Sequence, residues 1–189
     1  MERQLFVIEE GGSTIVIRFT RPEIRNPLSI DVLQELNGVL DRLTSDVRKL
    51  VFTGTDGVFA SGADLREIAN ITASDARAFA IRGQALMSRI ADLEQETVSA
   101  VNGYCFGGAL DLALACDRRI STPDSRFAHP GSGLGIITGW GGTQRLPRLV
   151  GTAHAFEIFF TASPVSASRA LEIGLIDYIA EDPVAASLG

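Results

Sequence analysis

The sequence predicts an α/β layered domain, and three observations support this prediction. The chain has 189 residues, which is enough for one domain with a substantial core. A β-hairpin pattern at the start is followed by alternating strand-like and helix-like segments. A content of 46% hydrophobic and 21% charged residues is typical of ordinary globular proteins. We therefore expect residues 1–189 to form a single domain.

The first segments are short and rich in β-branched and aromatic residues. Residues 4–9 and 13–19 form two such runs, and Gly11-Gly12 between them indicates a hairpin turn. Ser29 can cap the helix that follows, because apolar residues recur there at helical spacing. The expected buried positions of this helix are Val32, Leu33, Leu36, Leu40 and Leu43. Residues 49–52 then predict a strand that runs into a loop from Gly54 to Asp64.

The middle of the chain predicts a long helix and a short buried one. Thr72 followed by Asp75 is typical of a capped helix start, and residues 97–101 predict a strand after that helix. Residues 108–116 are apolar on nearly every side, so their helix should be buried. The buried positions expected in the long helix are Phe79, Gly83, Leu86, Met87, Ile90 and Leu93.

The last part of the chain predicts three helices, over residues 141–150, 153–160 and 166–173, with the last one ended by Gly174. Strands are expected over residues 118–121 and 175–179. Residues 181–189 are expected to form an unstructured tail.

Charge and cysteine content exclude several classes of protein. A net charge of −6 argues against nucleic-acid binding, which normally needs a basic face. No apolar run approaches the ~20 residues of a membrane helix, and the N-terminus lacks the apolar core of a secretory signal. No cysteine pattern suggests a metal site. We expect a cytoplasmic protein in which Cys105 and Cys116 are both free.

Two glycine-containing turns are the first candidate site residues. Ser61-Gly62-Ala63-Asp64 lies between a strand and a helix, and Gly62 allows the backbone to approach a ligand. Gly107-Gly108-Ala109 begins the buried helix, where free N–H groups favour an anion or a developing oxyanion. The alternatives are an ordinary β-to-α turn for the first and close helix–strand packing for the second. The two turns form an oxyanion hole if their N–H groups converge on one oxygen. A thioester carbonyl that becomes an enolate needs such donors most, because negative charge builds on its oxygen. Each donor then lowers the barrier by about 3 kcal/mol.

Several stretches, taken in order, resemble the enoyl-CoA hydratase/isomerase (crotonase) superfamily. They are Arg21-Pro22, Arg25 to Ser29, Phe59 to Leu65, Ala100 to Gly108, Leu112 to Asp117 and Gly141 to Pro147. The resemblance extends from about Phe6 to Ile179, and this combination is far more specific than any single glycine turn.

The resemblance implies a ββα spiral core, acyl-CoA as the substrate, no permanently bound cofactor, and a homotrimer or hexamer. It assigns the oxyanion-hole N–H groups to Ala63 and Gly108. It further implies that Ser61, Ala63, Asp64 and Leu65 contact CoA, and that Arg25 lies near its phosphates. A solvated surface role is the alternative for Arg25.

The sequence departs from the family pattern at both catalytic glutamates. The first glutamate position is Asp111 here, and the second is Gly131. Syn addition of water needs both proton transfers, each worth about 10²–10⁴ in rate, so we do not expect ordinary two-glutamate hydration. Asp111 can still serve as the acid/base residue at the carbon next to the thioester. The alternative is that Asp111 stabilises the first turn of its helix and pairs with an arginine.

Five further residues are candidates near the acyl group. His129 titrates near neutrality and lies two residues before Gly131, although a structural histidine is the alternative. Gly131 and Ser132 could admit water or a bulkier acyl group, and Ser132 or Thr138 could order a water or a carboxylate. Trp140 occupies a position in a loop that lines the acyl pocket of the family, with core packing as the alternative.

A second departure concerns the end of the chain. Family members continue with several helices after the position of Ile179, and we expect these C-terminal helices to be absent or truncated here. The leading hypothesis is an acyl-CoA lyase or isomerase that works through enolate stabilisation. The alternatives are a non-catalytic acyl-CoA-binding or assembly module, and a remnant that folds only with a partner chain.

Overall fold

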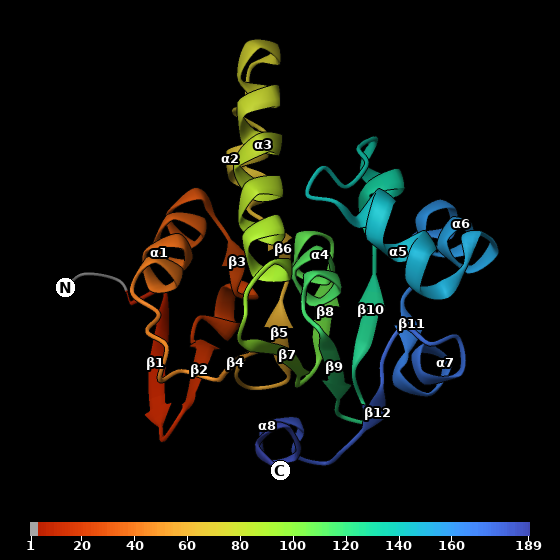
Figure 1. The fold of residues 1–189 in the computed structure, drawn as a ribbon. Helices are drawn as coiled ribbons and strands as arrows, with labels where there is room; N and C mark the ends of the chain where they lie inside the picture. The colour runs from red at the N-terminus through yellow and green to blue at the C-terminus, as the bar shows by residue number, and fades with distance from the viewer. Residues whose placement is uncertain (1–3) are drawn as a thin grey trace.

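The computed structural model describes residues 4–189 and confirms the mixed α/β architecture (Figure 1). Its elements, in chain order, are β1 (Phe6–Gly11), β2 (Thr14–Phe19), η1 (Pro22–Ile24), β3 (Pro27–Leu28), α1 (Ile30–Asp41), β4 (Lys49–Thr53), β5 (Val58–Ala60), β6 (Gly62–Ala63), α2 (Leu65–Ile68), α3 (Ala73–Ala91), β7 (Glu96–Val101), β8 (Tyr104–Phe106), α4 (Gly108–Ala115), β9 (Arg118–Ser121), β10 (Arg126–Ala128), η2 (Pro130–Leu134), α5 (Gly142–Val150), α6 (Thr152–Thr161), β11 (Val165–Ser166), α7 (Ala167–Glu172), β12 (Tyr178–Ile179) and α8 (Pro183–Leu188).

The largest sheet has the strand order β1-β2-β4-β7-β9-β12. The hairpin strands β1 and β2 are antiparallel, and every other neighbouring pair is parallel. Successive side chains of a strand point to opposite faces. Accordingly, Leu50 and Phe52 of β4 enter the main core, whereas Val51 enters a smaller cluster on the other face.

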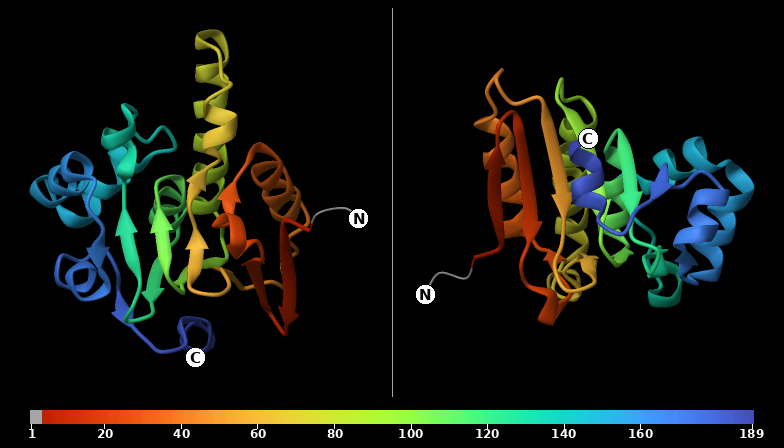
Figure 2. Two further views of the ribbon diagram at one scale, coloured as in Figure 1. Left: turned by 180° about the vertical axis from the view of Figure 1, so that it is seen from behind. Right: turned by 90° about the horizontal axis from the view of Figure 1, so that it is seen from below.

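A second sheet positions the candidate site. Its order is β11-β10-β8-β5, and β5, β8 and β10 run parallel to one another. The carboxyl ends of these three strands therefore meet at one edge, as the views in Figures 1 and 2 show. The segments that leave this edge are Ser61 to Ala63, Gly107-Gly108 and His129-Pro130. Both glycine-containing turns thus emerge side by side.

Six of the described helices contribute to the main core. Buried residues of α1, α3, α4, α5, α6 and α7 belong to one cluster with the strands. Helix α4 is buried from Ala109 to Ala115, as its apolar sequence predicts. Helix α3 extends well past the sheets in Figure 1, and only its second half contributes fully buried residues.

Local sequence signals place the helix starts correctly. The Ser29 side chain accepts a hydrogen bond from the Val32 N–H, and the Thr72 side chain accepts one from the Asp75 N–H. The segment from Gly54 to Asp64 was expected to be a loop, but it contains β5 and β6. These strands have only three and two residues, and their pairing partners lie far along the chain, in β8 and β3.

The prediction of an unstructured tail over residues 181–189 is wrong, because Pro183–Leu188 forms α8. The Asp182 side chain caps this helix by accepting the N–H groups of Val184 and Ala185. Apolar residues of α8 cover the outer face of the main sheet, and the Tyr178 hydroxyl donates to the Ala186 carbonyl at 2.9 Å. Contacts with a distant sheet therefore stabilise a helix that is too short to be recognised locally.

Two further expectations from the sequence concern the state of the cysteine thiols and the presence of membrane-spanning helices. Cys105 and Cys116 are both free and buried, as predicted, and burial raises the pKa of the Cys116 thiol to about 12. Within residues 4–189, no helix combines the length and the apolar character needed to cross a bilayer.

Replacing Asp182 by Ala removes the N-cap of α8. We expect this change to lower the free energy of unfolding by about 1 kcal/mol, measured by urea denaturation. The neighbouring Glu181→Ala is the control, since Glu181 is exposed and caps no helix. Equal stability of the two variants would show that the cap contributes nothing.

Candidate active site

The two glycine-containing turns touch each other. A Cβ atom built on Gly62 would lie 2.4 Å from the Gly108 nitrogen and 2.7 Å from the Phe106 carbonyl oxygen. Gly62 also has a φ of +83°, which L side chains rarely adopt. A Cβ atom built on Gly108 would lie 3.2 Å from the Ala63 nitrogen. The peptide nitrogens of Ala63 and Gly108 are thus neighbours on adjacent turns.

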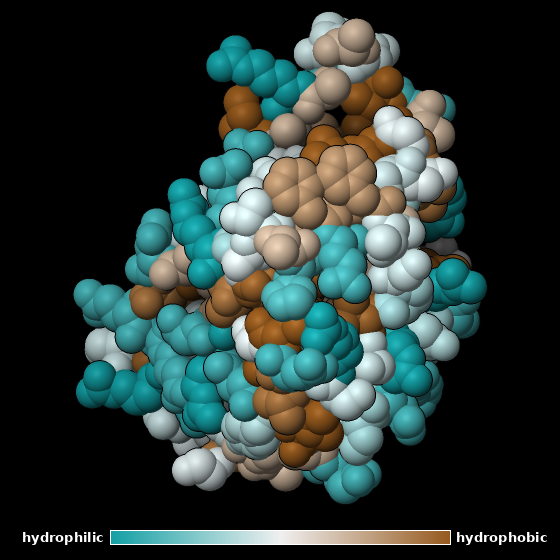
Figure 3. Space-filling view, turned by 90° about the vertical axis from the view of Figure 1, so that its right-hand side faces the viewer, coloured by the Kyte–Doolittle hydropathy of each residue, from teal (hydrophilic) through white to brown (hydrophobic). Residues whose placement is uncertain are grey.

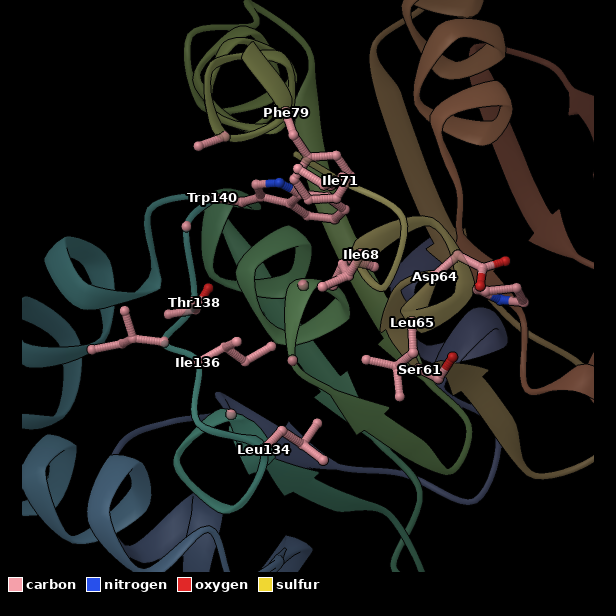
Figure 4. A pocket seen from close by; sticks show the side chains of 18 of the residues that line it. Ser61, Asp64, Leu65, Ile68, Ile71, Phe79, Leu134, Ile136, Thr138 and Trp140 are labelled. Carbon is pink, nitrogen blue, oxygen red and sulfur yellow. The ribbon is translucent and has the colours of Figure 1, made fainter. Parts of the chain in front are cut away.

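Trp140 packs against the second turn from the other side. It is 2% exposed, and a Cβ atom on Gly108 would lie 2.5 Å from its ring. A Cβ atom on Gly83 of α3 would lie 2.2 Å from the same indole. The Phe79 ring packs on it with centroids 5.7 Å apart (Figure 4). Trp140 therefore fills the space between α3 and the start of α4, which requires glycine on both sides.

Asn26 holds the first turn in place. Its side-chain amide donates to the carbonyl groups of Val58 and Phe59 at 3.0 and 3.1 Å, and its Oδ1 accepts the Arg21 N–H at 2.6 Å. The residue is 2% exposed and has a φ of +47°, a conformation that asparagine tolerates better than most residues. Asn26 thus connects the loop before α1 to the strand that leads into Ser61.

Both turns line one cavity of about 680 Å³. Figure 4 shows side chains from α2, α3 and the loop after η2 converging on it. Most lining side chains are apolar, and the exposed arginines Arg25 and Arg66 also belong to the lining. The apolar members are Ile24, Pro27, Leu65, Ile68, Ile71, Phe79, Leu134, Ile136, Ile137 and Trp140, among others. This volume is within the range of small-molecule sites.

Asp111 places a carboxylate in the same cavity, one helical turn beyond Gly108. Its side chain is fully buried, and the Thr138 hydroxyl donates to Oδ2. Burial raises the pKa of Asp111 to about 6, while Thr138, nearby peptide N–H groups and Arg145 oppose this rise. Its Oδ1 has no hydrogen-bond partner of its own among the described residues.

His129 lies beside this carboxylate at the end of β10. Its Nε2 is 3.5 Å from Asp111 Oδ1, and its ring packs on Phe159 with centroids 5.0 Å apart. The side chain is 3% exposed, and burial lowers the pKa of His129 to about 4. At neutral pH the imidazole is therefore uncharged, and it faces an oxygen that no other group binds.

A buried carboxylate thus lines the same cavity as two neighbouring peptide nitrogens. The sequence also matches a known family over nearly the whole chain. A family model described as enoyl-CoA hydratase/isomerase matches residues 9–186. The chain belongs to this family.

Individual relatives agree with this assignment. The short-chain-enoyl-CoA hydratase of Clostridium acetobutylicum is 38% identical over 184 residues, covering 96% of this chain and 70% of that protein. The mitochondrial methylglutaconyl-CoA hydratase of Homo sapiens is 36% identical over 176 residues, covering 92% of this chain and 52% of that protein. The chain therefore spans between half and about two thirds of the length of these two relatives.

Solved structures show the same fold. DspI of Pseudomonas aeruginosa superposes with a TM-score of 0.93 at 32% identity, covering 98% of this chain and 78% of that one. An enoyl-CoA hydratase from Thermoplasma volcanium gives a TM-score of 0.93 at 30% identity, with coverage of 99% and 76%. The spiral core that the family resemblance implies is thus confirmed.

In this family member, the segment around Gly131 is tightly closed. A Cβ atom on Gly131 would lie 2.6 Å from the Ile136 carbonyl oxygen, so a larger residue would require the loop to move. Gly131 lines the main cavity, whereas exposed Ser132 lines only a smaller cavity beside it. Asp64 and Asp111 are the only carboxylate residues that line the main cavity among the described residues.

The residues expected to contact CoA lie together along one part of the cavity lining. Arg25, Ser61, Ala63, Asp64 and Leu65 all belong to it, and Leu65 is 56% exposed. The Asp64 carboxylate caps α2 and binds the Arg66 guanidinium at 2.7 Å, and this contact lowers its pKa. The side chain of Asp64 therefore has a structural partner already, and its carbonyl group accepts the Ile68 N–H at 3.0 Å.

Two residues that shape the site carry only a weak signal in the sequence. Asn26 belongs to the stretch that resembles the family, yet nothing in its spacing indicates bonds to Val58 and Phe59. Thr138 is 27 residues from Asp111, and only the fold brings them together. In the described part of the chain, no group of three or more metal-ligating side chains is present.

Replacing Asp111 by Asn should stabilise the protein at neutral pH. The native carboxyl keeps its proton up to about pH 6, whereas the unfolded one loses it near 3.8. The native state therefore binds more protons in this window, and stability falls as pH rises through it, by about 3 kcal/mol. The Asn variant lacks this fall, so its advantage in stability should be absent below pH 4, grow between pH 4 and pH 6, and be complete above pH 6.

Urea denaturation between pH 4 and pH 8 measures this effect. Asp46→Asn is the matched control, because Asp46 is exposed. A constant stability difference between the Asp111 variant and the wild type across this range would contradict the burial argument.

Proposed function

We propose that this chain carries the active site of an acyl-CoA enzyme that stabilises a thioester enolate, with Asp111 as its acid/base residue. The observation that carries the proposal is the position of Asp111. Its buried carboxylate lines the same cavity as the adjacent peptide nitrogens of Ala63 and Gly108. Membership of the enoyl-CoA hydratase/isomerase family supports an enzyme that acts on acyl-CoA.

The proposed chemistry begins with the thioester carbonyl oxygen at the two turns. Loss of a proton from the carbon next to the carbonyl moves an electron pair onto that oxygen, and the N–H groups of Ala63 and Gly108 stabilise the charge. Two preorganised donors of this kind contribute several kcal/mol, about 3 kcal/mol each. The N-terminus of α4 adds the positive end of a helix dipole at the same place.

Asp111 is suited to receive and return that proton. A pKa of about 6 leaves the carboxylate ionised at neutral pH and makes it a stronger base than an exposed aspartate. Thr138 fixes Oδ2, so Oδ1 remains as the oxygen available for proton transfer. Neutral His129 at 3.5 Å can donate to this oxygen or to a water beside it.

A single carboxylate favours proton transfer at carbon, as in isomerisation or carbon–carbon lyase chemistry, over two-group hydration. The relatives of this chain named above are hydratases, which makes hydration by Asp111 and His129 the nearest competing reaction. A non-catalytic acyl-CoA-binding module is the second candidate function. Gly131 favours it, because that position contributes no carboxylate to the cavity.

The exposed arginines of the cavity lining suit the CoA portion of the ligand. Arg25 and Arg66 are cationic, and the phosphates of CoA are anionic. The apolar residues at the other lining positions suit the pantetheine and acyl portions.

Replacing Asp111 by Asn should abolish exchange of the C2 protons of butyryl-CoA in deuterated water, measured by mass spectrometry. We expect a loss of at least about 100-fold, with CoA binding by calorimetry within about twofold of the wild type. Asp46→Asn serves again as the control and should behave as the wild type. Exchange that persists in the Asp111 variant refutes this residue as the base. Exchange that is absent from the wild type despite CoA binding would favour the binding module.

The pH dependence of the exchange rate tests the same assignment. A base with a pKa of about 6 predicts a rate that falls about tenfold per unit as pH decreases below 6 and is level above it. The pKa of His129, about 4, predicts no separate inflection from this group between pH 5 and 8. A rate that does not change between pH 4.5 and 8 would rule out Asp111 as the titrating base.

A further inference from the structure

A smaller cavity lies next to the main one, between the loop after η2 and helix α6. We call it the side cavity, and its volume is about 170 Å³. It is lined by His129, Gly131, Ser132, Ile136, Ile137, Thr138, Phe156, Phe159 and Phe160. Three phenylalanines from one helix thus form one wall, and the glycine-containing loop forms the other.

The side cavity continues the path that a substrate would follow from the proposed oxyanion turns. Five of its lining residues, namely His129, Gly131, Ile136, Ile137 and Thr138, also line the main cavity. The two cavities therefore adjoin at these five residues. If the thioester carbonyl lies at Ala63 and Gly108 and its C2 lies at Asp111, the acyl chain is brought next to the shared residues His129 and Thr138, which both contact Asp111. His129 is 3.5 Å from Asp111 and faces both spaces.

The size of the side cavity defines the group that it can hold. A protein cavity of about 150 Å³ lined by Leu, Ile and Phe binds benzene. The side cavity is slightly larger, and five of its lining residues are Ile or Phe. The parallel rings of Phe156 and Phe160, with centroids 5.4 Å apart, lie in its outer wall. Flat or branched hydrocarbon groups pack well against such rings.

The charges around the side cavity exclude an ionised acyl group. None of its described lining residues is an arginine, a lysine or a carboxylate, and neutral His129 is its only titratable side chain. The Asp111 carboxylate, 3.5 Å from the lining residue His129, would repel a second anion. Burying an unpaired carboxylate there would be costly.

The outer wall is an apolar surface that an occupant would cover. Ile137 and Phe160 are 68% and 73% exposed, and Phe156 is 55% exposed. Figure 3 shows the face that carries α5 to α7, where brown apolar side chains gather toward the top of the view. Removing such side chains from water favours binding in proportion to the apolar area that is covered.

We infer that the side cavity binds the far end of the acyl group, and that the substrate is a thioester of an uncharged acid carrying a ring or a branched hydrocarbon near C3. This inference rests on the proposed function, since it places the carbonyl at the two turns. It adds a substrate class and names Ser132 and Phe156 as specificity-determining positions.

Calorimetry with unreactive saturated thioesters tests the inference on the 189-residue chain. The probes are free CoA, butyryl-CoA, 3-phenylpropanoyl-CoA and glutaryl-CoA. We expect the phenyl thioester to bind at least about tenfold more tightly than butyryl-CoA, because a buried ring adds several methylene equivalents of apolar area. Glutaryl-CoA, whose chain ends in a carboxylate, should bind no better than butyryl-CoA.

Two variants link this preference to the side cavity. Ser132→Phe adds a ring at an exposed position that lines only the side cavity, so it should reduce the ratio of phenyl-thioester to butyryl-CoA affinity to within about threefold. Phe156→Ala removes part of the wall and should weaken binding of the phenyl thioester. Ser168→Phe is the matched control, because Ser168 is exposed and lines neither cavity. Thermal unfolding shows that each variant is folded.

The outcomes separate this inference from the proposed function. Three results would each overturn the side cavity as the acyl site. They are equal affinity for the butyryl and phenyl thioesters, a ratio of these affinities that Ser132→Phe leaves unchanged, and a preference for glutaryl-CoA. C2 exchange on butyryl-CoA would still support the proposed function in those cases. Thioesters that bind no better than free CoA and show no exchange would overturn both.

Discussion

The close approach of two backbone turns is the constraint on which the rest of this structure depends. The Ser61–Ala63 turn and the Gly107-Gly108 turn approach so closely that a single methyl group on Gly62 would overlap the Gly108 nitrogen. Such an approach needs parallel neighbouring strands that end at one edge, and β5 and β8 supply them. Asn26 fixes the first turn from behind, and Trp140 fills the space behind the second. The glycines are therefore needed for the close approach of the two turns, and this approach makes the N–H groups of Ala63 and Gly108 neighbours.

The buried carboxylate of Asp111 lowers the stability of this fold and at the same time places a basic group in the cavity. Helix α4 is apolar and enclosed, so an ionised side chain within it opposes folding. The structure reduces this cost without removing it, through the Thr138 hydroxyl, the start of α5 and the positive charge of Arg145. One oxygen is left without a partner. Incomplete satisfaction of a buried polar group is common at functional sites, where the missing partner is often a ligand or a water.

The parts of the fold that sequence predicts are those with local causes. Ser29 and Thr72 cap their helices through bonds to residues three positions away, and the apolar periodicity of α1 and α3 depends only on spacing. The missed elements include β5, β6, β8, β10 and α8. They have two to six residues each and exist because distant strands pair with them or pack on them. Short segments lack both periodicity and enough local free energy to be recognised alone.

The residues of the candidate site likewise fall into those that the sequence indicates and those that only the fold reveals. The turns and Asp111 were identified because glycines and an isolated charge stand out within apolar sequence. Thr138 was noted as a residue that could order a carboxylate, but its pairing with Asp111 was not predicted. Phe159 and Gly142 did not stand out, since only the fold brings them to His129 and Asp111. The position of Ser132 shows a further limit: the residue type was noted, but which of two adjacent cavities it lines depends on the curvature of the loop.

Trp140 has a consequence of a different kind. It is the single tryptophan of the chain, and its indole lies against the turn that begins α4. All tryptophan fluorescence of this protein therefore arises from one buried ring within the lining of the main cavity. A ligand that enters the cavity changes the polarity and packing around that ring, so the protein contains its own optical reporter of occupancy. Titrations that follow emission can thus be carried out on the unlabelled chain.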